Sequence, residues 1–305
     1  AAAIFDALAI DDITKAADLF RPVFERTKGD DGYVSIEVAP TLARDTDATL
    51  AEARRLWRVV ARPNLMVKIP ATPEGIPAIE AAIADGININ VTLIFSLERY
   101  AEVTAAYLGG LRTRAAAGGD LTSIASVASF FVSRVDTAVD LLIDERIAAG
   151  AGDAEALRAL QGQAGIANAK LAYHAFQQTF GSAAFAELAA RGARRQRPLW
   201  ASTSTKNPNF PDLYYVEALI GPDTVDTMPP ATIAAYRDHG APEIRIDRGV
   251  DAARDTLARL AAAGLDLAAV LTRLEADGVA SFARSYDSLL AVVADRAAAS
   301  LPGRS

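Results

Sequence analysis

The sequence predicts an α/β fold, specifically a (β/α)8 TIM barrel with about six of its eight strands present in this chain. Short segments rich in apolar and β-branched residues alternate with longer segments of helical spacing, a pattern typical of repeated βα units and a parallel sheet. Polar and apolar side chains alternate within the strands, whereas strands of an open sheet covered on both faces are almost continuously apolar. A polar, enclosed face therefore favours a barrel, formed by one domain over residues 1–305.

The expected elements follow one another without a linker, a low-complexity tract or an internal repeat. An amphipathic helix opens the chain at residues 1–20. Segments that are short and bounded by Gly, Pro, Asn or Asp predict strands at 33–40, 64–70, 87–95, 123–132, 198–204 and 223–229. Helical spacing predicts helices at 44–62, 74–84, 97–117 and 134–149, paired helices over 153–195 and a C-terminal helical cap at about 250–297.

Composition excludes several classes of function. A net charge of −7 without long Lys/Arg runs argues against nucleic acid or an anionic membrane as a partner. The chain has no cysteine, and its two histidines, His174 and His239, lack the spacing of metal ligands, so we expect neither a metal nor another cofactor. No apolar run reaches the length of about 20 residues that spans a bilayer, and no signal peptide is recognisable, so we expect a cytoplasmic protein.

Polar side chains are expected to converge inside the barrel from several strands. Because neighbours on a strand face opposite sides, alternate residues share one face. The side chains placed together in this way are Tyr33, Ser35 and Glu37; Met66 and Lys68; Asn88, Asn90 and Thr92; and Val127, Ser129 and Phe131. In barrels of this class the chemistry takes place at the carboxyl ends of the strands, where most of the polar members of this set lie.

Lys68 stands in a short apolar strand, NLMVKIP (64–70), where a charged residue is unusual. Thr72, Pro73 and Glu74 then supply an N-cap hydroxyl, a proline for the first helical turn and an acid near the positive end of the helix dipole. Lys68 is therefore expected at the carboxyl end of a strand, just before a helix.

The choice of lysine at this position is informative, because only five of the 31 basic residues are lysines. A strand lysine is usually an edge charge or a side chain that reaches solvent. A lysine enclosed in a barrel can instead lose its proton and attack a carbonyl carbon, which arginine does not do. Glu37, on the preceding strand, would share the enclosure with Lys68. Spacing alone leaves two roles for Glu37 open, a simple ion pair with Lys68 and proton transfer through a water molecule.

Five motifs together resemble the transaldolase family: GYVSIEVAP, NLMVKIPATPEGIPAI, GININVTLIFSLERY, ASVASFFVSRVD and ASTSTKNP. The resemblance extends over essentially the whole chain. It implies a cofactor-free barrel enzyme of the pentose phosphate pathway, with sugar phosphates as its substrates. Such an enzyme moves a dihydroxyacetone unit from a ketose phosphate, sedoheptulose 7-phosphate or fructose 6-phosphate, to an aldose phosphate, glyceraldehyde 3-phosphate or erythrose 4-phosphate.

The resemblance also implies roles for individual residues, position by position. Lys68 matches the lysine that forms the Schiff base with C2 of the ketose phosphate. Glu37 and Thr92 match the pair that holds a catalytic water for proton transfer. Asn90 and Ser129 match groups that hydrogen-bond the hydroxyls of the dihydroxyacetone unit.

Three further positions match the substrate-binding residues of the family. Arg134, five residues past Ser129, matches the phosphate-binding arginine, a use that suits a planar bidentate donor. Lys206 lies where the family has a second basic phosphate ligand, although a loop lysine is more often solvated. Phe131 is expected beside the catalytic water, and a core aromatic is an equally good interpretation.

The sequence departs from the family pattern at its start. Transaldolases have a first strand with an aspartate that acts on the C4 hydroxyl and a second strand that ends in a substrate-contacting loop, and neither is recognisable here. We therefore expect that the first two βα units are missing. Asp136 and Asp226 follow other motifs and are not assigned the role of that aspartate.

Two alternatives to transaldolase remain open from the sequence. A different Schiff-base aldolase of sugar phosphates would also use a barrel lysine. A truncated, non-catalytic remnant is the second alternative, because unpaired edges of an incomplete barrel favour pairing with another chain. The same edges make a homo-oligomer possible.

Overall fold

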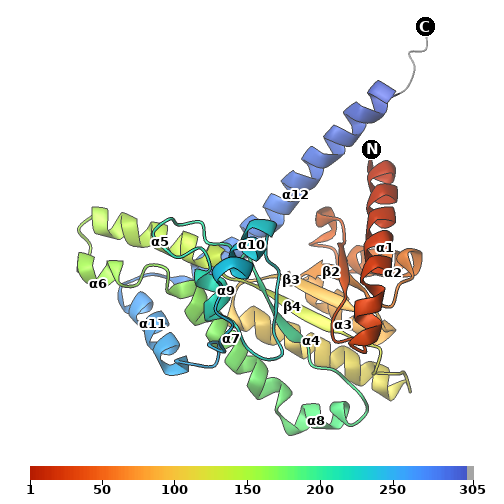
Figure 1. Ribbon diagram of the computed structural model, residues 1–305, viewed down its shortest axis with the longest axis horizontal. Coiled ribbons are helices and arrows are strands. Elements are labelled where there is room, and N and C mark those ends of the chain that lie inside the picture. The colour runs from red at the N-terminus through yellow and green to blue at the C-terminus, as the bar shows by residue number, and fades with distance from the viewer. Residues whose placement is uncertain (301–305) are drawn as a thin grey trace.

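One sheet of six parallel strands, in the order β1-β2-β3-β4-β5-β6, forms the centre of the molecule (Figure 1). The computed structural model describes residues 1–300. The strands are β1 (Val34–Glu37), β2 (Leu65–Pro70), β3 (Ile89–Ile94), β4 (Ser126–Phe131), β5 (Arg197–Ala201) and β6 (Val225–Asp226). Each segment expected to form a strand overlaps one of these six, although β5 begins one residue before the expected segment 198–204 and β6 has only two residues.

Helices connect the strands and cover the outer face of the sheet. Those up to β5 are α1 (Ala2–Arg26), the 3-10 helix η1 (Pro40–Leu42), α2 (Thr46–Val60), α3 (Gly75–Asp85), α4 (Leu97–Ala116), α5 (Ser133–Ala148), α6 (Ala154–Arg158), α7 (Ala164–Phe180) and α8 (Ala183–Ala189). Those after β5 are α9 (Tyr214–Ala218), α10 (Pro230–His239), α11 (Val250–Ala262) and α12 (Leu267–Ser300).

The sheet curls so that its two edge strands face the same enclosed space. Glu37 on β1 and Val225 on β6 line one cavity of about 480 Å³, together with residues from the four strands between them. Among the described residues, β1 pairs only with β2 and β6 only with β5, so the curled sheet is an open half-barrel. The expected α/β class is confirmed, and the described strands do not close into a ring.

The hydrophobic core has a layer on each face of the sheet. Ile89, Val91 and Trp200 point outwards and pack with α2, α3, α4 and α7. Leu93 and Phe131 belong to a second apolar cluster, to which α5, α11 and α12 contribute. The outward-facing half of the strands is therefore mainly apolar, whereas the inside of the half-barrel carries polar and apolar side chains together.

Helix boundaries differ from the sequence expectation at one position near Lys68. Helix α3 begins at Gly75, one residue after the expected start at 74, and its N-cap residue is Glu74 and not Thr72 as expected. The Thr72 hydroxyl still accepts a hydrogen bond from the Gly75 N–H at 3.0 Å, and it donates one to the Ala43 carbonyl. Thr72 therefore closes a tight turn before the helix, because its hydroxyl can satisfy a backbone N–H in a turn as well as at an N-cap.

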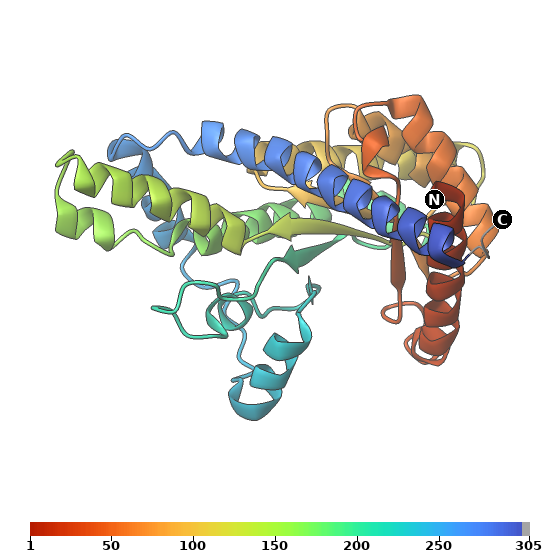
Figure 2. The same ribbon diagram turned by 90° about the horizontal axis from the view of Figure 1, so that it is seen from above.

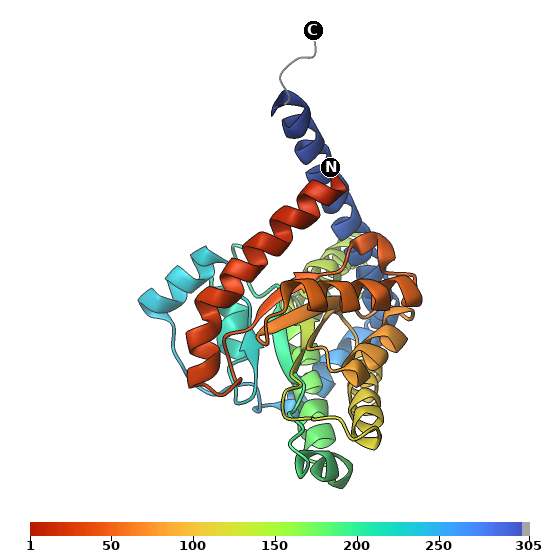
Figure 3. The same cartoon turned by 90° about the vertical axis from the view of Figure 1, so that its right-hand side faces the viewer.

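The two terminal helices meet away from the sheet. Helix α12 passes across the molecule and reaches α1 (Figure 2), and the two helices cross close to the N-terminus (Figure 3). The rings of Phe5 and Tyr286 pack edge to face there, with centroids 5.4 Å apart. No helix within residues 1–300 has the length and the apolar character needed to cross a membrane.

Candidate active site

Lys68 and Glu37 lie side by side at the carboxyl ends of neighbouring strands. The parallel register of β1 and β2 places Glu37 opposite Lys68, and the Lys68 Nζ is 3.4 Å from Glu37 Oε2. Their side chains are 24% and 27% exposed, so a solute can reach this pair from the cavity. Burial raises the pKa of the Glu37 carboxyl above its usual value, although the charge of Lys68 and its hydrogen bond act in the opposite direction.

Asn90 and Ser129 form a hydrogen-bonded chain along the inner wall. Asn90 lies opposite Lys68 in the register of β2 and β3. The Ser129 hydroxyl donates to Asn90 Oδ1 at 2.7 Å, and Asn90 Nδ2 donates to the Ser35 hydroxyl at 3.0 Å. This chain fixes the orientation of the Asn90 amide, because it uses one donor and the acceptor of that group.

Thr92 lies one inward position beyond Asn90 and is fully buried. Among the residues that the structure describes, the Thr92 hydroxyl has no hydrogen-bond partner. A buried hydroxyl without a partner costs free energy, on the order of 1–3 kcal/mol. Thr92 is therefore suited to bind a polar group that enters the site.

Phe131 and Arg134 occupy the adjoining end of β4 and the first turn of α5. Phe131 packs on Phe95 with ring centroids 5.0 Å apart, so it belongs to the core cluster as well as to the inner wall. The Arg134 guanidinium carbon is 5.2 Å from the centroid of the Phe131 ring. Its side chain forms no hydrogen bond or ion pair with any residue in the described part of the chain, which leaves its donors available for an anion.

Lys206 does not line the cavity that contains Lys68. It borders a separate cavity of about 300 Å³ with Ser133 and Asp136, at the start of α5. Lys206 therefore approaches the helix turn that carries Arg134, and the structure does not bring Lys206 next to Lys68.

Neither of the two aspartates left unassigned by the sequence lines the Lys68 cavity. Asp136 is 1% exposed and accepts a hydrogen bond from the Gly165 N–H at 2.7 Å. Asp226 neighbours Val225, which faces the cavity, so Asp226 faces the opposite side, where it accepts a hydrogen bond from Thr203 at 2.7 Å. Burial raises the pKa of Asp226 to about 6.

The sequence analysis gave no role to two residues next to Lys68 and Glu37. Ser35, which it placed on the inner face with Glu37, holds the Asn90 amide. Phe282 on α12 places its ring centroid 5.6 Å from Lys68 Nζ. Nothing in the local sequence predicts this contact, because it joins residues more than 200 positions apart.

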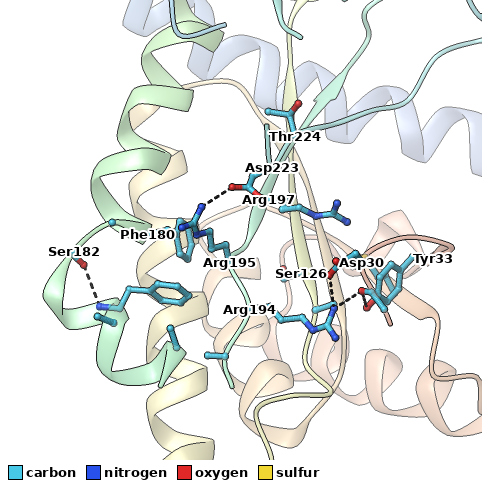
Figure 4. A pocket seen from close by; sticks show the side chains of 18 residues that line it. Asp30, Tyr33, Ser126, Phe180, Ser182, Arg194, Arg195, Arg197, Asp223 and Thr224 are labelled. Carbon is cyan, nitrogen blue, oxygen red and sulfur yellow. Dashed lines mark hydrogen bonds and ion pairs between the residues drawn. The ribbon is translucent and has the colours of Figure 1, made fainter. Parts of the chain in front are cut away.

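A second cavity, of about 700 Å³, lies at the opposite, amino-terminal ends of the strands (Figure 4). Most of its charged side chains form ion pairs with one another: Arg194 pairs with Asp30 at 3.1 Å, and Arg195 pairs with Asp223 at 2.6 Å. None of the site residues expected from the sequence lines this cavity. Within residues 1–300, no group of three or more His, Asp or Glu side chains is placed to hold a metal ion.

Comparison with known proteins assigns the chain to a family. The family model described as transaldolase/fructose-6-phosphate aldolase matches residues 1–293. A transaldolase of Thiobacillus denitrificans is 53% identical over 289 residues, which are 95% of this chain and 79% of the relative. A transaldolase of Thermobifida fusca is 54% identical over 94% of this chain and 77% of its own length, and one of Trichodesmium erythraeum is 45% identical over the same shares. The chain therefore belongs to the transaldolase/fructose-6-phosphate aldolase family.

Proposed function

We propose that this protein is a transaldolase that moves a dihydroxyacetone unit between sugar phosphates through a Schiff base on Lys68. The observation that carries the proposal is the Lys68–Glu37 pair, 3.4 Å apart at the carboxyl ends of two strands that line one cavity. The transaldolases to which the chain is 45–54% identical support the same reaction. The donor is sedoheptulose 7-phosphate or fructose 6-phosphate, and the acceptor is glyceraldehyde 3-phosphate or erythrose 4-phosphate.

The first half of the reaction makes the covalent intermediate. The Lys68 amine attacks C2 of the ketose phosphate, and loss of water gives an imine. The imine accepts electrons as the C3–C4 bond breaks, which releases an aldose phosphate and leaves a three-carbon enamine on Lys68. Glu37, whose carboxyl pKa is raised by burial, transfers protons with a water molecule held between Glu37 and Thr92.

The second half of the reaction requires that the enamine stay in place until an acceptor aldehyde arrives. Asn90 and Ser129 are proposed to hold the hydroxyls of the three-carbon unit, and their mutual hydrogen bond orients both groups before the substrate binds. Arg134 is proposed to bind the phosphate of donor and acceptor with Lys206, from the first turn of α5, where the helix dipole also favours an anion. Phe131 positions the Arg134 guanidinium by packing beneath it.

A trapping experiment tests the proposal. The purified protein is incubated with fructose 6-phosphate, reduced with borohydride and digested, and the peptides are analysed by mass. We expect a three-carbon adduct on the peptide that contains Lys68, and none in the Lys68→Arg variant. Lys15→Arg, which changes an exposed lysine on α1, is the matched control and should retain the adduct.

The outcome of trapping also separates the alternatives. A six-carbon adduct would mean that the imine forms but the C3–C4 bond does not break, and a folded chain without any adduct would contradict the proposed function. A free aldolase would accept dihydroxyacetone itself as donor, whereas a strict transaldolase uses it poorly. The Glu37→Gln variant should form the adduct about 10²–10⁴ times more slowly if Glu37 transfers the proton.

The half-barrel is proposed to be six strands of a (β/α)8 barrel, with the two further strands of that fold placed between β6 and β1. Three observations support this arrangement: the parallel order of the sheet, the edges of β1 and β6 that pair with no further described strand, and the cavity lined by all six strands. Residues 1–305 are proposed to act as one domain, with α11 and α12 as the C-terminal cap. A homo-oligomer, a cytoplasmic location and a reaction that needs neither metal nor cofactor stay predictions.

A further inference from the structure

Helix α12 is held over the carboxyl end of the sheet at two points. Arg99 on α4 forms an ion pair with Glu275 on α12 at 3.0 Å, and their side chains are only 17% and 18% exposed. Gly278, one turn further on, lies so close to β3 that an added Cβ would come within 2.9 Å of Leu93 Cδ2. Together these contacts fix the rotation and height of α12 above the strands.

Phe282 lies on the same face of α12, one turn beyond Gly278. Its ring centroid is 5.6 Å from Lys68 Nζ. Phe282 also lines a cavity of about 370 Å³ between α1, β1 and α12, which Ser35 and Glu37 border but Lys68 does not. The Phe282 ring therefore stands between this outer cavity and the Lys68 amine.

We propose that Phe282 is a positioning residue that keeps water away from the covalent intermediate on Lys68 and so favours transfer over hydrolysis. This inference rests on the proposed function of the site. The competing reaction adds one water: the enamine carbon takes a proton, the hydroxide oxygen bonds to C2, and the C2–N bond breaks as the proton of the new hydroxyl passes to the nitrogen. Its products are free dihydroxyacetone and the Lys68 amine.

The position of the ring explains why a transfer enzyme needs it. The enamine must survive after the first product has left and before the acceptor has entered, and during that interval the site is accessible to solvent from the inner cavity. A large apolar side chain beside the nitrogen excludes water from one side of the intermediate. Cover by Phe282 leaves the polar contact of the Lys68 amine with Glu37 in place, since Glu37 reaches Nζ from the neighbouring strand β1.

Graded variants at position 282 test this role. Phe282→Leu keeps an apolar but smaller cover, and Phe282→Ala removes it. Tyr286→Ala is the matched control, because Tyr286 lies one turn further along α12 and packs on Phe5, not on Lys68. The measured quantity is the ratio of free dihydroxyacetone released to three-carbon units transferred, with fructose 6-phosphate as donor and erythrose 4-phosphate as acceptor.

We expect the ratio to rise about tenfold in Phe282→Ala, by a smaller factor in Phe282→Leu, and not in Tyr286→Ala. A structural role alone would lower both reactions together and leave the ratio unchanged. If the Lys68 adduct still forms, an unchanged ratio in folded Phe282→Ala, or an equal rise in Tyr286→Ala, would overturn the inference but not the proposed function. Absence of the adduct in the unmodified protein would instead overturn the proposed function.

Discussion

Asp136 shows how one buried side chain connects two helices near the carboxyl end of β4. Its carboxyl is 1% exposed, and it accepts a hydrogen bond from the Gly165 N–H, which joins α5 to the start of α7. Burial, with a smaller contribution from Asp140, raises the pKa of Asp136 to about 7. The hydrogen bond from Gly165 acts in the opposite direction but is outweighed.

The raised pKa predicts a specific pH dependence of stability. The folded protein keeps the Asp136 proton up to about pH 7, whereas the unfolded chain releases it near pH 4. The contribution of protonated Asp136 to the free energy of unfolding is therefore complete below about pH 4. It is lost as the pH rises to 7, which lowers the free energy of unfolding by roughly 2–4 kcal/mol. Asp136→Asn does not titrate, so its free energy of unfolding, measured with urea at pH 4.5 and 7.5, should fall less over this range than that of the unmodified protein.

The control for this prediction is Asp144→Asn, two turns further along α5, where the side chain is exposed. Its unfolding free energy should follow that of the unmodified protein at both pH values. Identical pH slopes for Asp136→Asn and Asp144→Asn would contradict the assigned protonation of Asp136.

At the scale of the element, the close approach of α12 to β3 depends on the missing side chain of Gly278. A larger residue there must displace either the helix or the end of the Leu93 side chain, which is 1% exposed. We expect Gly278→Val to lower the free energy of unfolding by about 1–3 kcal/mol more than Ala280→Val does, because overpacking costs this much. Ala280→Val is the matched control, because it introduces the same β-branched side chain, with its lower helix propensity, at an exposed position of the same helix.

Both variants can be compared by thermal or urea unfolding, together with the yield of the Lys68 adduct. If Gly278 sets the height of α12, its variant should also lose adduct, since Phe282 would no longer cover Lys68. Equal stability of the two variants would show that α12 can move away from β3 without cost.

The strands were predictable because their signals are local. Alternation of polar and apolar residues placed Asn90 on the inner face, and in the structure Asn90 lines the Lys68 cavity. The helix start was predicted less well: Thr72 was expected as the N-cap, but its hydroxyl closes a turn and α3 begins at Gly75. The contact between Phe282 and Lys68 was not predictable, because it depends on where a distant helix packs.

For the whole molecule, the important property is the difference between the buried central strands of the sheet and its less buried edge strands. All six residues of β3 and all six of β4 are buried, and each of these strands has a partner on both sides. In β1 only Ile36 is buried, and neither residue of β6 is. Stability should therefore fall from the centre of the sheet towards β1 and β6, because local opening is easiest where burial and backbone pairing are least.

Hydrogen exchange followed by mass spectrometry measures this gradient directly. We expect amides of β3 and β4 to exchange only through global unfolding, and those of β1 and β6 to exchange faster by at least about tenfold. Glu37 lies on β1, the edge strand that is expected to open most easily. Substrate binding should therefore protect the amides of β1 more than those of β3. If the edge strands are as protected as β3 in the free protein, another chain segment must pair with them. Dilution would then identify that segment: protection by a second copy of the chain falls with concentration, whereas protection by an intramolecular partner does not.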